Sequence, residues 1–214
     1  AQWDPRTDGH LAAPFDAADP AGRAANKAAL QQRLGLEQDP DALLIGFVGR
    51  LAWQKGVDLI LGALPAMLGE GAQLAVLGSG EWGLEEGCRG AAWAHPGRVG
   101  VSIGFDESLA RLIYGGADAI LVPSRFEPCG LAQLCALRYG ALPVVAHVGG
   151  LVDSVVDASE MALANGWGTG LQFAPVTREM LESAVGRLGA LWRDRAAWRR
   201  VQANAMRTDV SWTR

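Results

Sequence analysis

Two cationic side chains share one short segment, residues 49–56, which reads GRLAWQKG. The segment directly follows a strand-length apolar run at residues 43–48. The guanidinium of Arg50 can bind two phosphate oxygens at once, and the ammonium of Lys55 can bind one as a point charge. An isolated basic pair is more often simply solvated, but ligands of parallel sheets bind at the carboxyl ends of strands. We therefore predict that Arg50 and Lys55 contact an anionic ligand.

A carboxylate and a helix start lie together in residues 123–131, which read PSRFEPCGL. These residues follow an apolar run at 119–122 and lead into a predicted helix at 130–139. Because Pro128 disfavours helical geometry at the residue before it, Glu127 is placed just ahead of the helix. The free amides and dipole of a helix N-terminus attract an anion. We predict that Glu127 contacts a ligand hydroxyl, although a carboxylate at this place could also serve only to complement the helix dipole.

Glycine-rich turns follow two further apolar runs. Gly149 and Gly150 come after residues 142–146, where backbone amides could face a ligand, but a tight turn explains the pair equally well. Residues 78–83 match the G-x-G-x-x-G pattern of dinucleotide-binding enzymes. That pattern follows the second apolar run rather than the first, and no acidic residue stands at the tip of the next run. A nicotinamide-dependent dehydrogenase is therefore the weaker interpretation.

The elements that must position these residues alternate along the chain. Strand-length apolar runs are interspersed with helical stretches, which is typical of βαβ units and a parallel sheet. The predicted strands are residues 43–48, 73–77, 99–103, 119–122 and 142–146. The predicted helices are residues 22–34, 56–68, 82–94, 107–114, 130–139, 151–156, 177–191 and 194–206. We predict an α/β fold with a Rossmann-like doubly wound parallel sheet, whose ligand lies at the carboxyl ends of the strands.

Composition narrows the function classes. The 214 residues are 50% hydrophobic with a formal net charge of -4, which indicates a globular domain without a nucleic-acid partner. Cys88, Cys129 and Cys135 show no CxxC spacing, so we expect no zinc site or disulfide scaffold and a cytoplasmic protein. No apolar run reaches the roughly 18–20 residues of a membrane span, so no membrane partner is expected. An Asp-x-Asp at residues 39–41 precedes the first strand, where a turn role is expected rather than metal binding.

Two of these segments resemble a known family. Residues 49–56 resemble the G-R-L-x-x-Q-K-G loop of bacterial glycogen synthases and plant starch synthases. Residues 124–131 resemble their S-R-F-E-P-C-G-L segment, and the similarity continues through residues 133–153. The pair Ser211 and Trp212 extends the similarity to near the end of the chain.

The resemblance implies the C-terminal half of a GT-B glycosyltransferase, an architecture built from two Rossmann-like domains. It implies retaining transfer of glucose from ADP-glucose to the non-reducing end of an α-1,4-glucan, without a metal or other cofactor. On this basis residues 1–40 are expected to form an interdomain linker or entry segment, and residues 41–214 the nucleotide-sugar-binding domain. The N-terminal domain that supplies the acceptor contacts is then a missing partner of this chain.

The family match also assigns roles to single residues. The predicted catalytic residues, which bind the diphosphate and the sugar of the donor, are Arg50, Lys55 and Glu127. The predicted substrate-binding residues are Phe105, Cys129, Gly130, Leu131, Ala132, Gly149 and Gly150. Within this set Phe105 is expected to lie against the adenine, and the backbone of residues 130–132 to hold the distal phosphate.

Other interpretations stay open beside this one. The chain could belong to another retaining GT-B transferase that uses UDP-glucose, or it could be a stand-alone nucleotide-binding module. Under the leading hypothesis the isolated chain binds ADP or ADP-glucose weakly. It transfers no glucose, because the half that binds the acceptor is missing.

Overall fold

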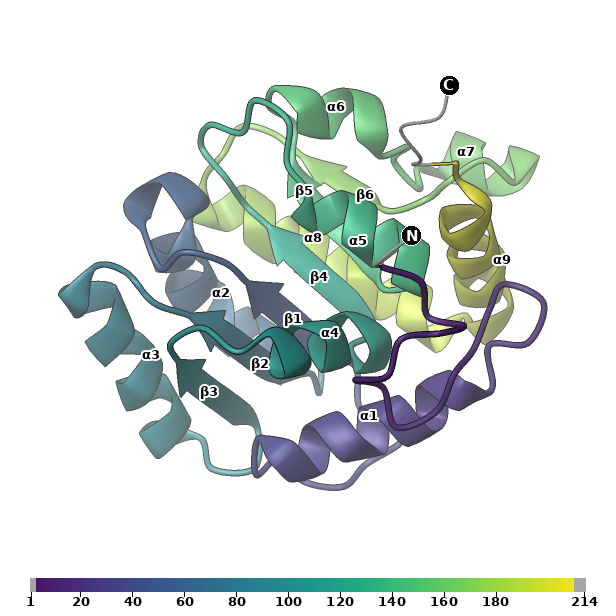
Figure 1. Cartoon of the computed structure of the whole chain (residues 1–214). Coiled ribbons are helices and arrows are strands. Elements are labelled where there is room, and N and C mark those ends of the chain that lie inside the picture. The colour runs from purple at the N-terminus through teal and green to yellow at the C-terminus, as the bar shows by residue number, and fades with distance from the viewer. Residues whose placement is uncertain (1–2, 210–214) are drawn as a thin grey trace.

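A computed structural model describes residues 3–209, so the resemblance at Ser211 and Trp212 lies outside the described residues. The centre of the described chain is a six-stranded parallel sheet in the order β3-β2-β1-β4-β5-β6 (Figure 1). The strands are β1 (Leu44–Val48), β2 (Gln73–Gly78), β3 (Val99–Ile103), β4 (Ala119–Val122), β5 (Leu142–Ala146) and β6 (Leu171–Phe173). The strand order reverses between β1 and β4, which is the topological switch point of a doubly wound sheet. This confirms the predicted Rossmann-like α/β fold.

Helices cover both faces of the sheet. They are α1 (Gly22–Arg33), α2 (Val57–Gly69), α3 (Trp82–Ala94), α4 (Glu107–Gly116), α5 (Ala132–Tyr139), α6 (Gly150–Ser154), α7 (Glu160–Asn165), α8 (Arg178–Arg193) and α9 (Arg195–Arg207), with a short 3-10 helix η1 (Trp53–Lys55). α2 and α8 lie behind the sheet in Figure 1, whereas α4 and α5 lie in front of it. Within residues 3–209, no helix combines the length and the apolar character that crossing a membrane requires.

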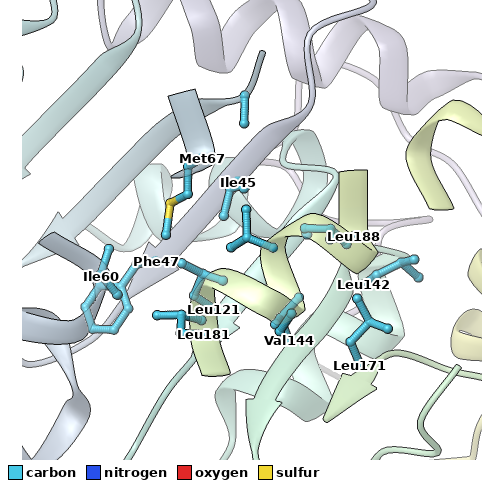
Figure 2. Packing of buried hydrophobic residues seen from close by; sticks show 14 of the residues in the cluster. Ile45, Phe47, Ile60, Met67, Leu121, Leu142, Val144, Leu171, Leu181 and Leu188 are labelled. Atoms are coloured by element: carbon cyan, nitrogen blue, oxygen red, sulfur yellow. The ribbon is translucent and has the colours of Figure 1, made fainter. Parts of the chain in front are cut away.

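The strands are apolar throughout because both of their faces are buried. In β1, Ile45 and Phe47 pack in one cluster with Met67 of α2 and Leu181 of α8 (Figure 2). Leu44, which points the other way, belongs to the cluster on the opposite face. This arrangement explains why the strands read as continuous apolar runs rather than as alternating patterns.

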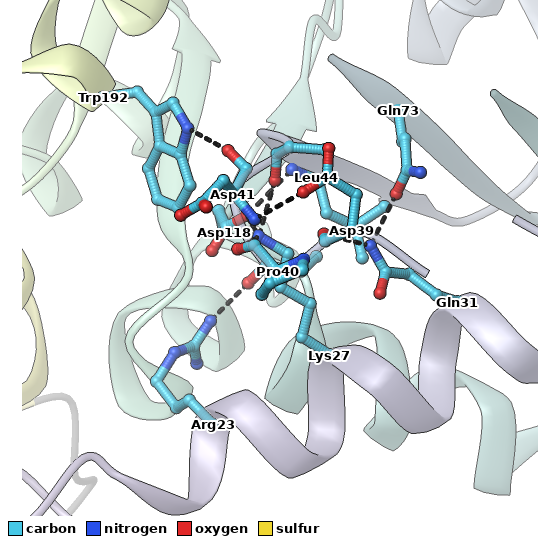
Figure 3. Close-up of polar contacts among 12 residues, drawn as sticks. Arg23, Lys27, Gln31, Asp39, Pro40, Asp41, Leu44, Gln73, Asp118 and Trp192 are labelled. Carbon is cyan, nitrogen blue, oxygen red and sulfur yellow. Dashed lines mark hydrogen bonds and ion pairs between the residues drawn. The ribbon is translucent and has the colours of Figure 1, made fainter. Parts of the chain in front are cut away.

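The segment before β1 is tied to the amino ends of the strands by a buried polar network (Figure 3). The ammonium of Lys27 on α1 donates to the carboxylate of Asp118 at 2.8 Å and to the carbonyl of Pro40 at 2.9 Å. The amide of Asp41 donates to the carboxylate of Asp39 at 2.8 Å, which confirms the predicted turn there. Whether this segment links two domains stays a prediction.

Three short elements, η1, α7 and β6, were not predicted from the sequence. α7 has six residues and β6 has three, which is too short for a periodic apolar pattern to appear. The helix predicted at residues 151–156 is α6, which begins one residue earlier and ends at Ser154. The sheet therefore extends one strand further than the sequence indicated, on the side away from β1.

Candidate active site

Three loops meet at the carboxyl ends of β1, β4 and β5. We call residues 49–56 the basic loop and residues 123–131 the helix-entry loop; the third loop carries the Gly149-Gly150 pair. The amide of Arg125 in the helix-entry loop donates to the carbonyl of Gln54 in the basic loop at 2.9 Å. The amide of Gly150 donates to the carbonyl of Glu127 at 3.1 Å. The two segments singled out in the sequence thus lie side by side, although about seventy residues separate them along the chain.

Two glycines allow this close approach. Gly56 ends η1 with a left-handed φ of 72°, and a Cβ there would collide with the carbonyl of Pro123. Gly149 has a φ of 49°, and a Cβ there would collide with the carbonyl of Glu127. Only glycine combines that backbone conformation with that contact. These two glycines therefore set the distance between the helix-entry loop and its neighbours.

Lys55 and Glu127 form an ion pair across the two loops. The hydroxyl of Ser124 donates to the same carboxylate oxygen, Oε2 of Glu127, at 3.1 Å. The Glu127 side chain is 11% exposed and that of Lys55 28%, so the pair is shielded but not sealed from solvent. The structure therefore brings into direct contact the residue predicted to bind phosphate, Lys55, and the residue predicted to bind the sugar, Glu127.

Arg50 is held by a residue that the sequence did not single out as functional. Its guanidinium donates to Oε1 of Gln54 at 2.9 Å, and Nε2 of Gln54 donates to the carbonyl of Phe126 at 3.0 Å. Gln54 therefore orients Arg50 and joins the basic loop to the helix-entry loop. Its place between the two cations in the sequence was the available signal, but the contact with Phe126 depends on the fold.

Arg125 provides a second connection that the sequence did not reveal. Its guanidinium donates to both carboxylate oxygens of Asp58 at 2.8 Å and lies 4.3 Å from the centre of the Trp53 ring. This hydrogen bonding from Arg125 lowers the pKa of the Asp58 carboxyl, so the pair stays charged. Arg125 therefore fixes the helix-entry loop to the start of α2 instead of facing a ligand.

The helix after Glu127 begins later than the sequence indicated. α5 starts at Ala132, because Gly130 has a left-handed φ of 69° that cannot be part of a helix. The prediction of a helix start at Gly130 was therefore wrong by two residues. The amides of the first turn, from Ala132 to Leu134, are the ones that lack an intrahelical acceptor. Cys129, Gly130 and Leu131 lie in the loop ahead of them, and their contacts with substrate stay a prediction.

Gln133 braces this loop from the inside. Its Nε2 donates to the carbonyls of Cys129 at 3.0 Å and Gly130 at 3.1 Å. The side chain is fully buried, and its Oε1 accepts no hydrogen bond within the described part of the chain. The loop is thereby held against the first turn of α5.

Phe105 stands apart from this group on the same edge of the sheet. It follows β3, which is two strands away from β1, and its side chain is 92% exposed. The structure does not bring the ring into contact with Lys55 or Glu127. The contact of Phe105 with a nucleobase therefore stays a prediction.

The G-x-G-x-x-G segment, residues 78–83, packs closely against the basic loop. A Cβ at Gly78 would collide with the carbonyl of Gly49, and a Cβ at Gly80 with the carbonyl of Leu51. The carboxylate of Glu81 accepts the amide of Trp53 at 2.9 Å. Gly78 and Gly80 therefore make room for the neighbouring loop, which accounts for the first two glycines of the pattern without a dinucleotide, whereas an added Cβ at Gly83 would meet nothing within 4 Å.

Comparison with known proteins places this site in a family. Residues 42–189 match the family model described as glycosyl transferases group 1. The chain belongs to this family. Over 98% of its length the chain is 60% identical to a glycogen synthase of Rhodopseudomonas palustris (strain HaA2), and over 100% it is 60% identical to one of Acidiphilium cryptum (strain JF-5). It spans 44% of each of these proteins, which is less than half of their length.

A solved structure gives the same picture for the fold. The chain is similar to the catalytic domain of starch synthase IV from Arabidopsis thaliana, whose structure was solved with ADP and acarbose. The two are 34% identical and superpose with a TM-score of 0.92. The match covers 99% of this chain and 44% of that domain. The described sheet and helices therefore have the fold of part of a GT-B glycosyltransferase. This family membership sets the dehydrogenase interpretation aside.

Proposed function

We propose that this chain is the donor-binding half of a glycogen synthase, a retaining enzyme that transfers glucose from ADP-glucose to the non-reducing end of an α-1,4-glucan. The observation that carries the proposal is the contact between Lys55 and Glu127, the residues that we propose to bind the phosphate and the sugar of the donor. Arg50 in the same loop and the free amides of α5 add further groups for an anion. The 60% identity to glycogen synthases supports the choice of substrates.

In this proposal the chain stabilises the departing nucleotide. When the bond between C1 of glucose and the phosphate oxygen breaks, its electron pair stays on ADP, and negative charge grows on the diphosphate. Arg50, Lys55 and the α5 amides face that charge, and removal of one such preorganised donor typically costs about 2.7–4 kcal/mol of transition-state stabilisation. We propose no metal ion, because two cations and a helix N-terminus supply the positive potential that the diphosphate needs.

Glu127 holds the sugar in this proposal. Its carboxylate accepts hydrogen bonds from Ser124 and Lys55, and the hydroxyls of glucose would join or replace them. Gly149 and Gly150, whose backbone lies against Glu127 and Pro128, would add amide donors on the same side. The exposed ring of Phe105 would pack against the adenine, which would favour ADP over UDP.

The remaining parts of the reaction belong to the rest of the protein. The chain spans 44% of its curated relatives, so we propose that the acceptor contacts lie in another domain. The chain alone would then bind ADP without elongating a glucan. We place the protein in the cytoplasm, in keeping with cysteines that are unpaired in the described chain.

Calorimetric titration with ADP, UDP and NAD tests this assignment. ADP should bind most tightly. Arg50→Ala and Lys55→Ala should each weaken ADP binding by roughly 1.5–3 kcal/mol, the value of one hydrogen bond to a charged group. Arg193→Ala is the matched control, because Arg193 lies at the far end of α8 and pairs with Glu70. Unchanged dissociation constants in both variants, or tighter binding of UDP or NAD, would overturn the assignment.

A further inference from the structure

The outer face of α3 carries two tryptophans that are almost fully exposed. Trp82 is 77% exposed and Trp93 is 87% exposed. Eleven residues separate them, which is close to three helical turns, so the two rings lie on one line about 16 Å apart. A tryptophan side chain is usually mostly buried, and two of them near the two ends of one solvent-facing helix surface expose a large apolar area.

The opposite side of α3 packs against the core and holds the helix on the sheet. Cys88 is buried there, and Leu84 and Ala91 pack against the same core cluster. α3 lies at the outer flank beside β3 (Figure 1), so its exposed face is turned away from the rest of the described chain. The two tryptophans are thus not needed to hold the helix in place.

The surface between the two rings is polar and open. Glu86 and Arg89 form an ion pair at 2.5 Å, and both side chains are exposed. Gly83 and Gly90 leave open space on either side of this pair. Arg89 also pairs with Glu85 at 3.6 Å, so the face presents two apolar rings separated by hydrogen-bond donors and acceptors without an excess of positive charge.

This pattern favours one class of ligand over the others. A partner helix would need continuous apolar positions at i, i+3, i+4 and i+7, and the middle of this face is a charged pair instead. A nucleic acid or an anionic membrane would need a basic cluster, and Arg89 is neutralised by Glu86. A sugar polymer has apolar ring faces and hydroxyl edges in alternation and carries no charge, so it matches the two rings and the polar groups between them.

The exposed face of α3 also begins at the rim of the candidate site. Trp82 directly follows Glu81, whose amide donates to the carbonyl of Leu51 in the basic loop at 2.7 Å. The carboxylate of Glu81 accepts the amide of Trp53, whose ring is 59% exposed. A polymer lying along α3 would therefore lead away from the place where the donor is proposed to bind.

We propose that Trp82 and Trp93 form a surface site for an α-1,4-glucan chain. Each indole stacks on a glucose ring, and Glu86 and Arg89 between them exchange hydrogen bonds with the hydroxyls. The site keeps the polymer near the donor site after its end has left. The identity of the polymer rests on the proposed function; the shape and charge of the site do not.

Native electrophoresis of the 214-residue chain in gels with and without glycogen tests the proposal. The wild-type chain should be retarded by glycogen. Trp82→Ala and Trp93→Ala should each weaken the apparent affinity by roughly fivefold to tenfold, the loss expected for one aromatic contact. The double variant should lose retardation, whereas Trp82→Phe should keep most of it because the ring remains. Trp167→Ala is the matched control, since Trp167 is 65% exposed and lies outside α3.

Two outcomes would overturn the proposal. One is a wild-type chain that glycogen does not retard, or a double variant that is retarded as strongly as the wild type. The other is a dimer that the double variant converts to a monomer, which would make this face a contact between copies of the chain. ADP titration of the same proteins separates the two assignments: ADP binding without glycogen binding removes the surface site only, and glycogen binding without ADP binding removes the proposed donor site only.

Discussion

Gln54 is the residue on which the arrangement of the site depends most directly. Its side chain accepts from Arg50 and donates to the carbonyl of Phe126, and its own carbonyl accepts the amide of Arg125. One neutral side chain therefore orients a cation and spans two loops. A positively charged residue at this position could not accept from Arg50, and a smaller one could not reach both loops.

Gln54→Met keeps the length of the side chain and removes both of its hydrogen bonds. We expect ADP binding to weaken by roughly 1–2 kcal/mol, since each lost hydrogen bond contributes about 0.5–1.5 kcal/mol. Part of this effect acts through Arg50, so the loss should shrink when the change is made in an Arg50→Ala background. Calorimetry of the four proteins measures that coupling. Equal losses in both backgrounds would show that Gln54 acts independently of Arg50.

At the scale of elements, the long periodic segments were predictable and the junctions were not. β1 to β5 and the long helices appeared in the sequence because their apolar runs and periodicities extend over many residues. The start of α5 was misplaced because Gly130 adopts a left-handed conformation that sequence alone does not specify. The contacts of Gln54 and Arg125 were missed because each joins segments that only the fold brings together.

The convergence of the two loops was predictable from the position of residues rather than from their type alone. Lys55 and Glu127 each follow a strand of a parallel sheet, and the carboxyl ends of such strands share one edge. Their direct contact confirms that the two segments converge. Phe105 shares the edge but not the contact, because β3 lies at the end of the sheet. Strand order, which the sequence did not provide, decides which loops become neighbours.

Gly149→Ala tests the close packing of the third loop. The added Cβ would collide with the carbonyl of Glu127 and would also be strained at a φ of 49°. Gly166→Ala is the matched control, because Gly166 has a φ of 75° with nothing within 4 Å of the added atom. The control should lose only the roughly 1–2 kcal/mol of a left-handed residue in unfolding free energy and keep its affinity for ADP. Gly149→Ala should lose more stability and bind ADP more weakly; identical behaviour of the two variants would show that the contact with Glu127 does not shape the site.

At the scale of the whole molecule, a buried ion pair attaches the first residues to the sheet domain. Asp8 and Arg111 are 3.1 Å apart, with side chains that are 1% and 5% exposed. The hydroxyl of Tyr139 on α5 donates to the same carboxylate, and Arg111 also pairs with Glu107 at 2.7 Å. The segment around Asp8 is therefore held by the front layer of helices, α4 and α5.

Asp8→Asn removes the charge from this pair and keeps the shape of the side chain. Loss of one partner of a buried pair typically costs 3–5 kcal/mol, and we expect about 3 kcal/mol at pH 7 because Arg111 keeps Glu107. Urea unfolding measures the change. Glu182→Gln is the control, since its exposed pair with Arg178 at 3.3 Å should contribute no more than about 1 kcal/mol.

The pair of Asp8 and Arg111 should also make the unfolding free energy depend on pH. Burial opposes the charge on Asp8, but hydrogen bonds from Tyr139, the His10 amide and Arg111 outweigh it, so the pKa of Asp8 lies below its ordinary value. A carboxyl with a lowered pKa in the folded state stabilises the protein above its unfolded pKa of about 3.9, and this contribution disappears as the pH falls through the folded value. The wild-type chain should therefore lose stability below about pH 4 more steeply than Asp8→Asn, and the two unfolding free energies should converge in acid. Parallel pH profiles, with a constant gap between the two proteins, would mean that folding does not change the pKa of Asp8 and that the buried charges do not lower it.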